Sequence, residues 1–174
     1  MRLAFLVSLS ALAYGQSRPV EATYDKATNQ TLFTGFSAIR VPPTAQDRLP
    51  ECRIPHTVEY SRFQVTYACP GDASGCSNGK LVIKFSFCTT SWTFNTVQLS
   101  MAIDGRPVAL PPSVHPSSVL TAAVLDDSVS VEVPLSATRG LSSDSKIEVN
   151  LGVFNYELSR DNVSVVRAVA ERIR

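Results

Sequence analysis

The sequence predicts a mainly β protein, an antiparallel β-sandwich of about eight strands with a C-terminal α-helix. Apolar residues recur at every second position in several segments, which is typical of strands with one buried face. Turn pairs such as Asp104-Gly105 separate these segments. Helical spacing of apolar residues occurs only near the C-terminus.

The N-terminus has the three parts of a secretory signal peptide. A charged start precedes the apolar run Leu3–Ala13, which is too short to span a bilayer. Small residues at Ala13 and Gly15 then precede a predicted cleavage before Gln16. The alternative, a buried N-terminal helix or strand, is disfavoured by the charged start and the small residues. We therefore expect a secreted or periplasmic protein without a membrane-spanning segment.

The expected domain organisation follows from this signal. The segments are a signal peptide at 1–15, a flexible N-terminal arm at 16–29 and a single β-sandwich domain at 30–174, with its helix at 159–173. Loss of Arg2 with the signal leaves 15 basic against 15 acidic residues, a net charge of zero. Because a neutral chain with scattered charges lacks a basic patch, no nucleic acid partner is expected.

The first half of the domain is predicted to hold two strand regions and two loops. Gln30–Val41 is the first strand, with Gly35 as a bulge or a place of close backbone approach. Pro42–His56 is a connecting loop, because it has four prolines and no periodicity. Residues 58–69 form one bulged strand or two short ones, since the apolar parity changes midway. Turn pairs within 70–79 then reverse the chain.

The segment Lys80–Val108 is predicted to be the packed centre of the domain. Four apolar residues alternate with more polar ones along its first strand: Leu81, Ile83, Phe85 and Phe87. A second alternating run extends from Val97 to Ile103, and Asp104-Gly105 supplies a hairpin turn that tolerates positive φ.

The second half is predicted to add a hairpin, a last strand and a helix. Residues 119–125 and 129–135 form the hairpin, with Asp126-Asp127-Ser128 as its turn. The last strand begins at Ile147, and a bulge at Gly152 explains a change of apolar parity. Ser159 caps the helix, whose apolar stripe is Val163, Val166, Ala170 and Ile173. Because so short a helix is marginal alone, this stripe must be covered by the sheet or by a partner.

Four cysteines in an exported chain predict two disulfides. Three connectivities are possible. The pair Cys69–Cys76 is favoured because the turn residues between them bring the ends together, which leaves Cys52–Cys88. A zinc site with His56 as an extra ligand is the alternative, but no C-x-x-C spacing supports it. We therefore expect neither a metal nor a cofactor.

Other residues that could carry chemistry have simpler interpretations. His56 and His115 both lie in proline-rich loops without a nucleophile motif beside them. The pair Asp126-Asp127 is expected in a turn, where Asp is common for backbone reasons. Trp92, Phe94 and several tyrosines could form a stacking platform, but Trp92 is expected to pack in the core because it follows the central strand closely. No catalytic residue is therefore assigned.

Two further kinds of site are possible alternatives. One is a weak calcium site on turn carbonyls. The other is N-glycosylation at Asn29 or Asn162, and the Asn162 sequon lies within the predicted helix.

Three stretches resemble a group of secreted bacterial β-rich proteins that has no known activity. They are Thr23-Tyr24-Asp25-Lys26 with Thr31, the segment from Trp92 to Asp104-Gly105-Arg106, and Phe154-Asn155-Tyr156-Glu157-Leu158-Ser159 leading into residues 163–173. The resemblance implies a small β-rich envelope domain closed by a C-terminal helix. The loop that carries Cys69 and Cys76 is not part of the shared pattern.

The sequence favours a non-catalytic exported β-domain that binds an envelope or extracellular protein or glycan. One alternative is a hydrolase built on loop residues such as His56, His115 and Asp126. Another is a structural subunit of an envelope assembly. Exposed aromatic residues clustered on a sheet face would favour binding, a cleft joining a histidine, an acid and a serine would favour the hydrolase, and a long unpaired edge strand would favour assembly.

Overall fold

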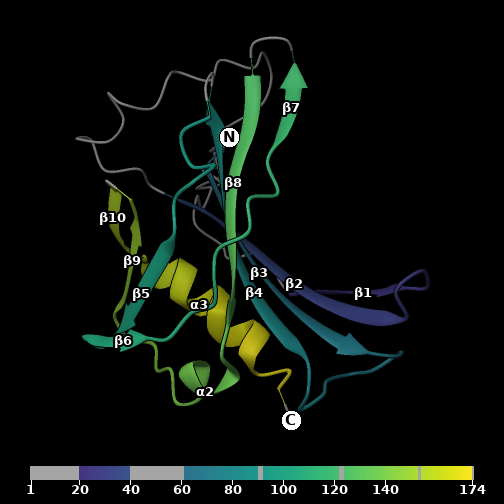
Figure 1. Ribbon diagram of the computed structural model, residues 1–174. Coiled ribbons are helices and arrows are strands. Elements are labelled where there is room, and N and C mark those ends of the chain that lie inside the picture. The colour runs from purple at the N-terminus through teal and green to yellow at the C-terminus, as the bar shows by residue number, and fades with distance from the viewer. Residues whose placement is uncertain (1–19, 40–60, 90–91, 122–123, 153, 174) are drawn as a thin grey trace, which may run out of the picture.

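The computed structural model describes residues 20–39, 61–89, 92–121, 124–152 and 154–173. In these residues, ten strands form two antiparallel sheets, and the C-terminal helix α3 packs on the larger sheet (Figure 1). The predicted fold class is confirmed, with ten strands rather than about eight. The predicted signal peptide and the loop that holds Cys52 and His56 lie outside the described residues.

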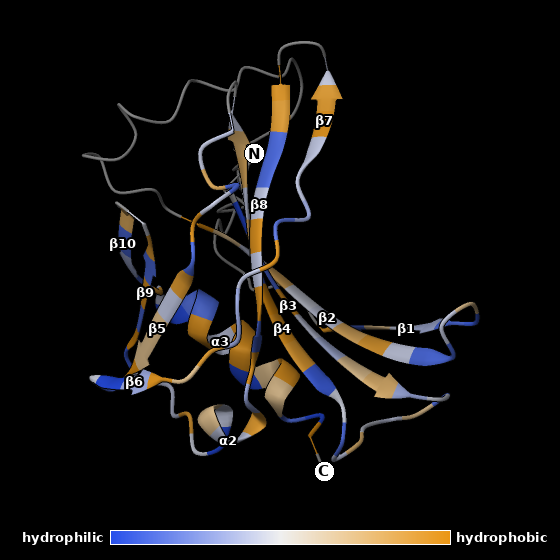
Figure 2. Ribbon diagram, viewed as in Figure 1, coloured by the Kyte–Doolittle hydropathy of each residue, from blue (hydrophilic) through white to orange (hydrophobic). Residues whose placement is uncertain are grey.

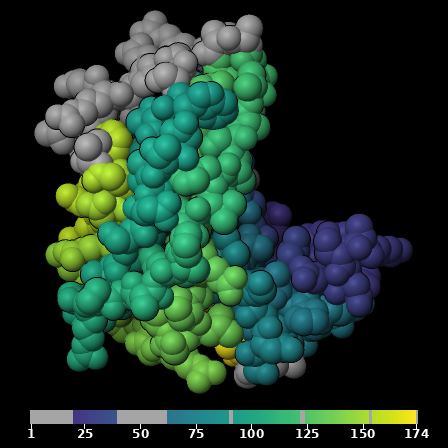
Figure 3. Space-filling model, viewed as in Figure 1, coloured from purple at the N-terminus to yellow at the C-terminus, as the bar shows by residue number. Residues whose placement is uncertain are grey.

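The larger sheet has six strands in the order β1-β2-β3-β4-β8-β7. In chain order they are β1 (Glu21–Asp25), β2 (Gln30–Ala38), β3 (Ser61–Pro70), β4 (Lys80–Thr89), β7 (Ser118–Thr121) and β8 (Val124–Val133). The predicted central strand is indeed β4, which pairs with β3 on one side and β8 on the other. Figure 3 shows the N-terminal strands projecting sideways from the main body of the molecule.

The smaller sheet has four strands in the order β10-β9-β5-β6. In chain order they are β5 (Leu99–Ile103), β6 (Arg106–Val108), β9 (Ile147–Leu151) and β10 (Phe154–Glu157). Two helices complete the described fold: the single turn α2 (Leu135–Thr138) and α3 (Arg160–Ala170). Neither described helix is long and apolar enough to cross a membrane.

The core lies between the two sheets and beneath α3. Alternation along β3 and β4 turns one row of side chains inward, and Phe63 pairs with Phe85 at a ring separation of 5.2 Å. Phe87 joins the sheets, because its ring stacks on Phe94 at 4.5 Å and lies 6.4 Å from Tyr156 of β10. The smaller sheet therefore covers one part of the inner face of the larger sheet, and α3 covers the part at β2 and β3.

Helix α3 begins with the predicted cap. Ser159 accepts a hydrogen bond from the Asn162 backbone N–H, and the Asn162 side chain accepts one from the Ser159 N–H in return. The buried face differs from the predicted stripe, because Val165 and Val169 are buried beside Val163 and Val166, whereas Ala170 and Ile173 are only half-buried. The larger sheet covers this face, which is one of the two alternatives that the sequence left open.

Gly35 is the place of close approach that the sequence predicted. A Cβ atom at this position would lie 2.7 Å from Cγ1 of Val165 and 3.3 Å from Cγ2 of Val169. Glycine at position 35 is therefore required for α3 to pack this close to β2.

Three predictions about individual elements were wrong. Residues 16–29 are not an arm throughout, since Glu21–Asp25 form β1, whose side chains are largely exposed and give no apolar pattern. Asp126-Asp127 lie within β8 rather than in a turn. Gly152 is not a bulge but a turn residue with φ of 68° between the antiparallel strands β9 and β10.

The disulfide pair favoured by the sequence is present. Cys69 at the end of β3 is bonded to Cys76, with Cα atoms 5.8 Å apart. The backbone N–H of Cys76 donates to the carbonyl of Arg172 at 3.3 Å, and Cys76 forms an isolated bridge with Ile173. Cys88 is disulfide-bonded as well, while its predicted partner lies outside the described residues.

Candidate protein-binding edge

Of the three residues named for a hydrolase, His115 and Asp126 are described by the structure, and no hydrogen bond joins their side chains, while His56 lies outside the described residues. Asp126 accepts a hydrogen bond from Ser128 Oγ at 2.7 Å and lies 3.9 Å from Lys84 Nζ. His115 Nδ1 is buried and makes no hydrogen bond within the structure. Across the described residues, no group of His, Cys, Asp and Glu side chains is placed to hold a metal ion.

The neighbouring carboxylate, Asp127, is fully buried and holds two segments against β8. It accepts hydrogen bonds from the backbone N–H groups of Thr93 at 2.5 Å and Phe94 at 2.8 Å. Its other oxygen lies 3.2 Å from the hydroxyl of Ser117, which also accepts from the N–H of Ser128 at 2.8 Å. A buried carboxylate needs such donors, so this position in a strand is satisfied by its partners.

The segment that leads into β7 runs along the open side of β8. Val114 exchanges two backbone hydrogen bonds of 2.8 Å with Ser130. Pro111, Pro112 and Pro116 flank this bridge, and proline has no N–H to offer to another strand. The lower part of this sheet edge is thus protected against further pairing, whereas β7 itself contains no proline.

Strand β7 exposes apolar side chains. Val119 is 65% exposed and Leu120 is 42% exposed, and we call these two residues the apolar edge. Figure 2 shows hydrophobic colouring on β7 and on the adjacent end of β8, which project together from the body. No Asp, Glu, Lys or Arg occurs from Pro107 to Leu125, so no charged side chain within this segment guards the apolar edge.

Trp92 adds to this surface and corrects the sequence-based expectation. Its side chain is 44% exposed, whereas Phe94 is fully buried. Val119 of β7 pairs with Leu125 of β8. Leu125 and Asp127 are two positions apart in β8, so their side chains lie on the same face of the sheet. Val119 therefore faces the side on which Asp127 binds the loop of Trp92. The exposed indole and Val119 therefore lie on one face of the larger sheet, whereas alternation turns Leu120 to the other face.

The other edges of the two sheets are better guarded. β1 begins at Glu21 and ends at Asp25, both charged. β6 has three residues, of which Arg106 is charged and Pro107 lacks an N–H. β10 ends at Glu157. Among the described strands at sheet edges, β7 alone consists of uncharged, proline-free residues with exposed aliphatic side chains.

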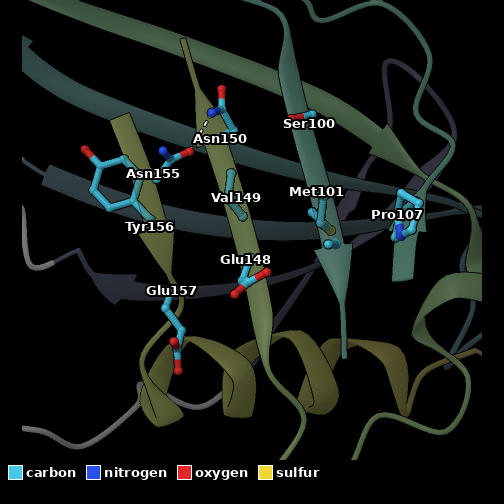
Figure 4. Close-up of a pocket in the computed structure, with 11 residues that line it drawn as sticks. Ser100, Met101, Pro107, Glu148, Val149, Asn150, Asn155, Tyr156 and Glu157 are labelled. Carbon is cyan, nitrogen blue, oxygen red and sulfur yellow. Dashed lines mark hydrogen bonds between the residues drawn. The ribbon is translucent and has the colours of Figure 1, made fainter. Parts of the chain in front are cut away.

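A shallow depression on the outer face of the smaller sheet is a weaker candidate for a site (Figure 4). Its polar groups bind one another: Asn150 donates to Asn155, and Lys146 lies 2.8 Å from Glu148 and 3.1 Å from Glu157. These two carboxylates raise the pKa of Lys146 above its ordinary value. Tyr156, the aromatic residue among those that line it, is buried against Phe87, so the depression offers little of the stacking surface that a glycan site uses.

The two asparagines of the predicted glycosylation sequons, Asn29 and Asn162, have structural roles. Asn29 is exposed in the β1–β2 turn and accepts a hydrogen bond from the Tyr24 hydroxyl at 2.7 Å. Asn162 is buried, and its side-chain amide donates to Ser37 and Ala38 of β2. One signal in the sequence could have revealed the apolar edge, namely the uncharged stretch that surrounds β7.

Comparison with known proteins adds no relative. No protein-family model, curated protein or solved structure matches the chain.

Proposed function

We propose that the protein is a non-catalytic, exported β-domain that binds an envelope or extracellular protein through strand β7. The observation that carries the proposal is the exposure of Val119 and Leu120 on an edge strand that has neither charge nor proline. An edge strand presents unpaired backbone N–H and C=O groups, and a strand from a partner would satisfy them. The same contact would remove the two aliphatic side chains from water.

Two further features support this reading. The anchored loop places Trp92 on the same face as Val119, where a large aromatic side chain can serve as a contact residue. The disulfide between Cys69 and Cys76 is typical of proteins in oxidising compartments, which agrees with export. The short length of β7, four residues, favours one bound partner over an extended assembly.

Site-specific photo-crosslinking tests the proposal. A benzophenone amino acid replaces Val119 in one variant and Tyr24 on β1, another exposed edge residue, in a matched control. Both are illuminated in envelope and culture-medium extracts of the producing cells. We expect one defined protein adduct from position 119 and none from position 24.

A second substitution verifies that the adduct reports the apolar edge. Leu120→Lys should weaken binding of the purified partner at least about tenfold, because it brings a charge into an apolar contact. Lys80→Ala, on the exposed end of β4, is the control and should leave affinity unchanged. Equal adducts from both edges, or full affinity in Leu120→Lys, would refute binding through β7.

A further inference from the structure

A second cavity opens between the edge strand β6 and the turn that contains α2, at the base of the molecule in Figure 1. Its volume is about 580 Å³, within the usual range for small-molecule sites. It involves none of the residues of the apolar edge.

The inner wall of this cavity is apolar. Ile103, Val108, Ala137 and Leu141 line it, and each is a partly buried residue that packs against the main core. The register of β5 and β6 explains this wall, because Val108 pairs with Met101 and so faces the same inner side of the sheet. The cavity is therefore a lateral opening of the hydrophobic core.

The rim of the cavity is cationic. Arg106 and Arg139 both line it, one from β6 and one from the end of α2. In the part of the chain that the structure describes, neither guanidinium forms an ion pair. Ser136 adds a hydroxyl to the same rim.

One acid also lines the cavity, but its carboxylate is engaged elsewhere. Asp104 accepts a hydrogen bond from the Lys146 backbone N–H at 2.8 Å and lies 3.4 Å from the Ser145 hydroxyl. The Asp104 carboxylate thus holds the β5–β6 turn against the residues just before β9. The two arginines remain in excess over this single acid.

We propose that the cavity binds a small amphipathic carboxylate, a molecule with one carboxylate group and an apolar body. The carboxylate would pair with Arg106 and Arg139, since the planar guanidinium fork matches a carboxylate with two parallel hydrogen bonds. The apolar body would lie against Ile103, Val108 and Leu141. This site is independent of the partner proposed for β7.

The test is a titration of the full-length mature protein, followed by amide chemical shifts, with 2-naphthoate as the probe and neutral 2-naphthamide as its matched control. We expect saturable shifts confined to residues 103–109 and 134–141. The amide should bind at least about tenfold more weakly, the loss typical of a charge-assisted hydrogen bond.

Two variants complete the experiment. The double substitution Arg106→Gln and Arg139→Gln should weaken naphthoate binding at least about tenfold, whereas Arg160→Gln, on the exposed start of α3, should leave it within about twofold. Leu120→Lys should bind naphthoate normally, which separates this site from the apolar edge. Absence of saturable naphthoate binding, equal affinity for the amide, or unchanged affinity in the double variant would each overturn the proposal.

Discussion

Substitution of Gly35 by alanine tests how closely α3 packs on β2. The added Cβ would lie 2.7 Å from Val165 Cγ1, well inside ordinary van der Waals contact, so the helix must shift or the Val165 side chain must leave its rotamer. Overpacking of this kind typically destabilises a protein by about 1–3 kcal/mol. For a domain of this size, that loss corresponds to a melting temperature lower by roughly 3–10 °C.

A double-mutant cycle isolates this steric contact. Val165→Ala alone removes two buried methyl groups and should cost about 2 kcal/mol. In the Gly35→Ala, Val165→Ala double variant, the new Cβ no longer meets Cγ1 and fills part of the vacated space. The combined loss should therefore be smaller than the sum of the single losses by about 1 kcal/mol or more.

Urea denaturation followed by circular dichroism provides the four free energies of unfolding. Simple additivity within about 0.3 kcal/mol would mean that the two side chains do not meet. An unchanged stability of Gly35→Ala would contradict the packing of α3 on β2 altogether.

Three other predictions concern the helix, the disulfide and a buried hydroxyl. Val166→Asp should lower the free energy of unfolding of the monomer by several kcal/mol, because it places an unpaired charge in the core; an unchanged melting temperature would show that the sheet does not cover α3. Replacing Cys69 and Cys76 by serine should destabilise the protein by about 2–3 kcal/mol, the chain-entropy value for a short loop, measured by the same urea method. Burial raises the pKa of Tyr156 to about 12, so the neutral phenol is favoured in the folded state. Stability should thus be intact below about pH 10 and fall as the pH rises through 12. Tyr156→Phe should remove that part of the fall without loss at neutral pH, because its hydroxyl has no hydrogen-bond partner; an identical alkaline profile would refute the assignment.

The sequence revealed those strands and helices that have one solvent-exposed face and one buried face. β4 alternates cleanly because its inner row packs under the smaller sheet while Lys80, Val82 and Lys84 face outward. The N-cap of α3 is also a local pattern, and the sequence predicts Ser159 there, although not the reciprocal hydrogen bond of Asn162. β1 left no such pattern, since almost all of its side chains are exposed.

The parts that the sequence concealed depend on contacts between distant segments. Asp127 looks like a turn residue until Thr93 and Phe94, more than 30 positions away, supply its hydrogen bonds. The exposure of Trp92 follows from the same hydrogen bonds to Asp127. They direct the side chain of Phe94, two positions further on, into the core and leave the indole of Trp92 exposed. The cationic cavity likewise joins Arg106 to Arg139 through folding alone.

The docking of α3 on β2 sets an order of events during biosynthesis. The Asn162 side-chain amide binds Ser37 across 125 residues of chain, and Gly35 meets Val165 beside it. Because the ribosome releases the N-terminus first, the inner face of β2 and β3 stays exposed until α3, near the end of the chain, has been synthesised. Such long sequence separations slow folding and prolong the time in which apolar strands are accessible to aggregation. A nascent chain that stops short of residue 159 should therefore need a chaperone far more than the finished protein does.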